Sequence, residues 1–184
     1  MNISKELNLV IPIERDGVKL YAHSVPVSRE TFENYHAILA KTFSQVTDGG
    51  LNVTAGLATA ALSLRDAAKA REMWDGPNGV KAGLMNEIRR ITSVIAPGDT
   101  GNTVYTLHDA ATRGVLDEDE VSEVENAIVF FTLVSRMFRK AQVPMMMSAI
   151  CGMGGLSITS LSSTAFSDSL RTSTATETSP PQAG

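Results

Sequence analysis

The last 29 residues set the strongest limit on what this chain can fold into, because they lack the means to build a core of their own. Fourteen of the residues from Leu156 to Gly184 are Ser or Thr, and three carry charge. Ordering a backbone costs roughly 1–2 kcal/mol per residue, and so few large apolar side chains do not offset that cost. We therefore expect a folded body over residues 1–155. Residues 156–184 should form a flexible, poorly ordered tail, which stays disordered or folds against another molecule.

Two short β-prone runs open the body. Residues 7–13 (LNLVIPI) and 18–25 (VKLYAHSV) flank an Asp16-Gly17 pair, and Asp-Gly favours the positive φ angles of a tight hairpin turn. Pro12 has no amide hydrogen for a neighbouring strand, so the first strand is expected at a sheet edge or with a local irregularity. The sequence therefore predicts an N-terminal β-hairpin that packs against helices.

Apolar residues at three- and four-residue spacing then predict a series of helices. Ser28 is a suitable N-cap for the first helix, and Asp117 with Glu120 forms the pattern of a capping box for the last. The last helix has a broad apolar face, which indicates burial on more than one side. The expected fold is mainly α, with about five helices behind the hairpin. The expected segments are helices over 28–47, 54–74, 79–95, 107–113 and 118–142, with a loop over 98–105.

A methionine-rich run follows the last predicted helix. Met145, Met146 and Met147 follow Pro144 directly, and Ile150 and Met153 continue the apolar character. Flexible Met side chains fill irregular cores and also form surfaces that accept varied partners. Both interpretations remain open at this point, core packing and an exposed partner-binding groove.

Composition excludes several classes of function. The net charge of −4 gives no general attraction to nucleic acid or to an anionic membrane. No uninterrupted apolar window is long enough to span a bilayer, and the N-terminus has no export signal. The single cysteine, Cys151, rules out an internal disulfide framework and fits a reducing cytoplasm.

No catalytic or metal-binding pattern emerges from the titratable residues. His23, His36 and His108 are scattered, without the spacing of metal ligands. The acidic run from Asp117 is explained by helix capping. We therefore expect no enzyme activity, no cofactor and no metal. A small enzyme remains an alternative. It would need a polar pocket that no sequence motif indicates, for example one that joins His36 to Asp66.

Three stretches of the sequence carry a family resemblance: LVIPIERDGVKLYAHSVPVSRETFENYHAIL, EVENAIVFFTLVSRMF and TSLSSTAFSDSLRTST. With the order of hairpin, helices and Ser/Thr-rich tail, the chain resembles the tail assembly chaperones of long-tailed bacteriophages. The resemblance implies a protein of the infected bacterial cytoplasm that binds the tape measure protein and recruits tail tube subunits. The expected partner-binding residues are Met145, Met146, Met147, Ile150 and Met153 in the body and Leu161, Phe166 and Leu170 in the tail.

A rival reading of the same features is a minor structural tail or connector protein that stays in the virion. Its tail segment would then become ordered by adding to the sheet or groove of a neighbouring subunit. Both hypotheses are compatible with a homo-oligomer, because the broad apolar face of the last helix allows burial against a second copy of the chain.

Overall fold

A five-stranded antiparallel sheet organises the molecule, in the order β4-β3-β2-β1-β5. The computed structural model describes residues 7–48, 53–99, 101–138, 142–143, 145–146 and 155–176. The strands are β1 (Asn8–Arg15), β2 (Val18–Ser24), β3 (Thr92–Gly98), β4 (Gly101–Thr106) and β5 (Ser157–Thr159). The expectation of a mainly α fold with a single hairpin was wrong: the chain combines helices and sheet.

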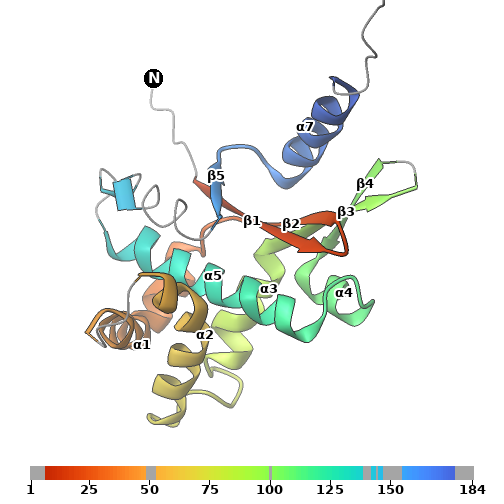
Figure 1. The fold of residues 1–184 in the computed structure, drawn as a ribbon. Coiled ribbons are helices and arrows are strands. Elements are labelled where there is room, and N and C mark those ends of the chain that lie inside the picture. The colour runs from red at the N-terminus through yellow and green to blue at the C-terminus, as the bar shows by residue number, and fades with distance from the viewer. Residues whose placement is uncertain are drawn as a thin grey trace, which may run out of the picture.

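The helices lie on both sides of this sheet. Figure 1 shows α1 to α5 on one side and α7 on the other. We call the sheet face that carries α7 the outer face, and the opposite one the core face. The helical segments are α1 (Arg29–Asp48), α2 (Val53–Lys69), the π-helix η1 (Lys81–Met85), α3 (Asn86–Ile91), α4 (Leu107–Thr112), α5 (Glu118–Met137) and α7 (Ser163–Thr176).

The N-terminal hairpin was predicted correctly. Asp16 and Gly17 form its two-residue turn, with φ angles of 50° and 78°, as a type I′ turn requires. Pro12 does not lie on an edge strand, because β1 pairs with both β2 and β5. However, β5 reaches only Asn8 to Val10, so the missing amide hydrogen of Pro12 interrupts no pairing with β5.

The second hairpin was missed. Residues 79–95 were predicted as one helix and 98–105 as a loop, whereas the helix ends at Ile91 and β3 and β4 follow. The run from Thr92 to Ile95 contains three β-branched residues, which favour strands. The backbone of β2 offers this run a pairing edge, and that long-range pairing outweighs the apolar helical spacing.

The C-terminal segment is ordered up to Thr176, and this corrects the expectation of a poorly ordered tail. It forms β5 and α7, while residues 177–184 lie outside the described part. The segment does fold against another surface, as its composition requires, but that surface is the sheet of its own chain. The predicted boundary after residue 155 thus falls inside the sheet, between the strands β1 to β4 and the fifth strand, β5.

Helix α5 is the centre of the core. All residues from Asn126 to Val134 are buried, because this stretch lies between the sheet and the pair α1 and α2. The predicted burial on more than one side is confirmed. The Asn126 side-chain oxygen accepts a hydrogen bond from the Ala61 amide of α2, with an N···O distance of 2.8 Å.

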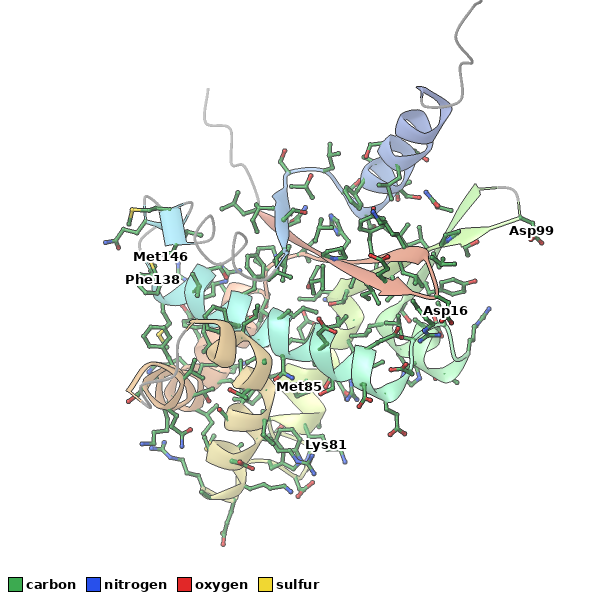
Figure 2. The ribbon with its side chains drawn as sticks, in the orientation of Figure 1. Asp16, Lys81, Met85, Asp99, Phe138 and Met146 are labelled. Atoms are coloured by element: carbon green, nitrogen blue, oxygen red, sulfur yellow. The ribbon has the colours of Figure 1, made fainter. Side chains whose placement is uncertain are left out.

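The π-helix meets α1 at a glycine. The Tyr35 hydroxyl donates to the carbonyl oxygens of Asn78 and Gly79, each at 3.3 Å. On this path the ring crosses Gly83, where a Cβ atom would lie 2.6 Å from the Tyr35 Cζ atom and closer still to the hydroxyl oxygen. The missing side chain at Gly83 therefore lets α1 approach the start of η1 (Lys81 and Met85 mark η1 in Figure 2).

Candidate polypeptide-binding surfaces

The structure separates the predicted partner-binding residues into two groups on different parts of the molecule. Met145 and Met146 follow α5, while Leu161, Phe166 and Leu170 belong to the C-terminal segment near the outer face. The sequence had suggested that the tail reaches away from the body, whereas the structure returns it to the sheet. Three of the predicted residues lie outside the described part of the chain: Met147, Ile150 and Met153.

An apolar cluster, here the α5-end cluster, lies where α5 ends. The name covers Phe43, whose ring contacts Phe138, Met137 and Phe138 at the end of α5, and Met145 and Met146, which follow in the chain. The rings of Phe43 and Phe138 meet edge to face, with centroids 5.8 Å apart; Phe138 and Met146 are labelled in Figure 2. Met146 is half-buried against the core, whereas Met145 is 69% exposed. The cluster thus begins in the core and ends in solvent: Met146 fits the core-packing interpretation, and partner binding through Met145 stays a prediction.

The second surface is the outer face of the sheet, which the sequence did not predict. Residues directly opposite each other on neighbouring strands share one face, and Pro12, Tyr21, Ile95 and Val104 are opposite one another across four strands. We call this line the apolar row. Ile95 is 1% exposed and Tyr21 is half-buried, while Pro12 and Val104 at the two ends are exposed.

Helix α7 covers the middle of the apolar row. The Phe166 ring meets the Tyr21 ring edge to face at 5.6 Å and lies 6.0 Å from the His23 ring. The Asn102 amide donates to the Ser167 carbonyl at 3.2 Å. Phe166 therefore points to its own sheet, and contact with a partner through this ring requires α7 to leave.

Two buried polar side chains hold the segment that leads into α7. The Asn8 amide donates to the Leu161 carbonyl oxygen at 2.8 Å, and the His23 Nε2 atom lies 2.9 Å from the same oxygen. A carbonyl only accepts, so this contact requires the His23 tautomer that is protonated at Nε2. Burial lowers the pKa of His23, because desolvation penalises the charged ring more than the Leu161 carbonyl favours it.

This attachment is incomplete at Asn8. Its side chain is 4% exposed, and its Oδ1 atom has no hydrogen-bond partner among the residues that the structure describes. An unsatisfied buried acceptor costs about 1–3 kcal/mol. The C-terminal segment thus lies on its sheet with one polar atom unpaired, beside a histidine that burial disfavours in its charged form.

The pattern of apolar residues in the first two strands indicated that the outer face of the sheet is covered. In β2, Leu20 and Ala22 face the core, yet His23 between Ala22 and Ser24 is also buried. In β1 the run from Asn8 to Ile11 is buried without interruption. Continuous burial is typical of strands that are covered on both faces, and a stretch such as LNLVIPI therefore pointed to a second layer.

The groups considered for catalysis are not brought together. His36 and Asp66 are both exposed, on α1 and α2. Asp117 and Glu120 form the predicted capping box, with each side chain 2.9 Å from the other residue's amide nitrogen, and Glu120 also pairs with Arg15 at 2.9 Å. Cys151 lies outside the described residues. Within 7–48, 53–99, 101–138 and the shorter described segments, no three His, Cys, Asp or Glu side chains are grouped to hold a metal ion.

A hollow of about 410 Å³ lies between α2, α5 and β1. Its wall is apolar at Ile11, Leu57 and Leu156 and polar at four residues of α5: Asp119, Ser122, Glu123 and Asn126. The first three are exposed, and the buried Asn126 is bonded to the Ala61 amide. In the described part of the chain, no helix has the length and apolar character needed to cross a membrane.

Comparison of the chain with protein-family models, with curated proteins and with solved structures finds no match. The family resemblance therefore rests on the three sequence stretches, and the physical argument on the two surfaces described above.

Proposed function

We propose that this chain is a tail assembly chaperone of a long-tailed bacteriophage, which binds the tape measure protein in the infected cell and recruits tail tube subunits. The resemblance of the three stretches supports the family. The observation that carries the physical argument is the exposure of Met145, whose apolar side chain is 69% exposed in the α5-end cluster. A chaperone of an apolar-striped helix needs such an adaptable surface.

The α5-end cluster suits this role because it combines a rigid and an adaptable part. Phe43 and Phe138 are held by their mutual ring contact, whereas Met145 adapts to the client at little cost. Burying a Met side chain contributes about 1.5–3 kcal/mol, which corresponds to a modest affinity for each copy. Many copies on one long tape measure then bind tightly through effective concentration.

Co-expression with the tape measure protein tests the proposal. The wild-type chain should keep a tape measure fragment in the soluble fraction and should co-purify with it. Met145→Ser should weaken the complex about tenfold, since roughly 1.4 kcal/mol of apolar burial is lost. The matched control is Leu62→Ser, because Leu62 is 55% exposed on α2, outside the cluster. A fragment whose solubility is the same with and without the chain refutes the proposal.

Recruitment of tube subunits is a separate step with its own test. Leu161 is 40% exposed beside the segment that attaches to the sheet, so Leu161→Ser should lower capture of tube subunits by the complex without affecting the tape measure. Mass spectrometry of purified virions then distinguishes the rival reading. Absence of the chain from the particle supports the chaperone, and stoichiometric presence supports a structural tail or connector protein.

A further inference from the structure

Helix α7 leaves parts of the apolar row uncovered. Ile95 in the middle is 1% exposed, but Val104 at one end is 43% exposed and Pro12 at the other end is also exposed. All four side chains of the row are uncharged. Val104 thus stays partly open although α7 lies against β4, and the row continues past α7 at Pro12 on β1.

Helix α7 shows which chemistry this face accepts. It has no acidic residue in its first turn and no basic residue in its last. It contacts the face through one aromatic anchor, Phe166, surrounded by small residues such as Ala165 and Ser167. A helix with an apolar stripe, an aromatic anchor and few charges therefore fits the face, and α7 occupies the position of such a ligand.

The contacts that hold α7 also allow its release. The segment is fixed by three residues of β5, by the two hydrogen bonds to the Leu161 carbonyl, by the hydrogen bond from the Asn102 amide to the Ser167 carbonyl and by the Phe166 ring. The Oδ1 atom of Asn8 gains no partner from the segment among the described residues. A competing helix that covers more of the apolar row thus makes more contacts with the sheet than the C-terminal segment does, and it displaces that segment.

We propose that the outer face is a docking surface for a helical segment of the tape measure protein. In the free chain α7 occupies this surface as an intramolecular ligand, until the helix of the tape measure protein displaces it. This inference rests on the proposed function for the identity of the helix. In the free chaperone the row is kept from non-specific contacts, and on the client the displaced segment 156–176 becomes available to other tail proteins.

A synthetic peptide with the sequence of residues 157–176 tests the docking surface without the client. The full chain carrying Phe166→Ala should bind the peptide at least about tenfold more tightly than the wild-type chain, whose own segment competes at millimolar effective concentration. Adding Val104→Lys should lower the peptide affinity, whereas adding Leu62→Lys, also at an exposed apolar residue, should not. Equal binding to the wild-type and Phe166→Ala chains overturns the inference.

Hydrogen exchange on the unmodified chain gives a second measurement, which does not depend on the folding of a variant. Addition of the tape measure fragment should speed amide exchange in α7 and slow it in β4. If the fragment binds and α7 remains protected, the inference is wrong while the proposed function stands. If the fragment does not bind any form of the chain, the proposed function is wrong, and the peptide experiment decides separately whether the outer face binds a helix.

Discussion

The contact between Tyr35 and Gly83 allows a prediction in which two effects of opposite sign compete. Replacing a helical Gly by Ala ordinarily stabilises a protein by about 0.5–1 kcal/mol, because the unfolded chain loses conformational freedom. Gly83 is not among the residues with positive φ, so its backbone suits alanine. The new methyl group, however, would lie 2.6 Å from the Tyr35 Cζ atom, well inside van der Waals contact.

In the wild-type background, the steric overlap of the new methyl group with Tyr35 determines whether Gly83→Ala raises or lowers the free energy of unfolding. To make room the ring must move, and the hydroxyl then loses its contacts with the Asn78 and Gly79 carbonyl oxygens. The lost hydrogen bonding costs about 0.5–1.5 kcal/mol, and overpacking costs about 1–3 kcal/mol. After subtracting the gain from alanine, we expect Gly83→Ala to lower the free energy of unfolding by about 0.5–4 kcal/mol.

A double-mutant cycle measures the competition. In a Tyr35→Ala background the overlap is absent, and Gly83→Ala should raise the free energy of unfolding by about 0.5–1 kcal/mol. The assay is urea unfolding of the four proteins, followed by circular dichroism. If Gly83→Ala has the same effect in both backgrounds within about 0.5 kcal/mol, the approach of α1 through Gly83 is not what the structure indicates.

Three further predictions concern the core, the attachment of the C-terminal segment at His23 and the start of α5. Phe131→Ala should lower the free energy of unfolding by about 3–5 kcal/mol in the same urea assay, since Phe131 is 1% exposed. Burial lowers the pKa of His23; above pH 6.5, the ordinary histidine pKa, the ring is neutral in both states. As pH falls below 6.5 the unfolded chain takes up the proton first, so stability is lost, and unfolding curves at pH 7.5 and 5.5 should show a smaller loss for His23→Gln than for wild type. Asp117→Ala removes a cap that accepts the Glu120 amide and should cost about 0.5–2 kcal/mol by thermal unfolding, whereas Asp119→Ala, at an exposed neighbour, should cost much less.

The local features of the fold could be read from the sequence because each depends on a few adjacent residues. The Asp16-Gly17 turn, the Ser28 cap and the Asp117–Glu120 capping box all appear as predicted. The Ser28 hydroxyl accepts the Thr31 amide at 3.1 Å. The helix over 107–113 was also found, and it is followed by Gly114 with a φ of 70°. At the caps a side chain satisfies a backbone amide three residues away, and the turn depends on the positive φ angles of two adjacent residues.

The sheet could not be read in the same way because its pairings join distant residues. Ile95 was expected on the inner side of a helix, and its apolar neighbours do recur at helical spacing. Its actual partners are Tyr21 and Val104 on neighbouring strands, and no local pattern reveals the first of these. Of the two candidate surfaces, the methionine run was identified from composition. The outer face was missed because it exists only once β1 to β4 are assembled.

The attachment of the C-terminal segment also fixes the order in which the molecule becomes complete. The Asn8 amide bonds to the Leu161 carbonyl, 153 positions further along the chain, and β1 receives β5 as its second neighbour over a similar separation. During synthesis the first hairpin is therefore made long before the strand that flanks it. Closing so long a loop is slow compared with local hairpin and helix formation. A nascent or truncated chain that stops before residue 157 exposes Ile95 and the row around it, and it must either aggregate or find a helix from another polypeptide.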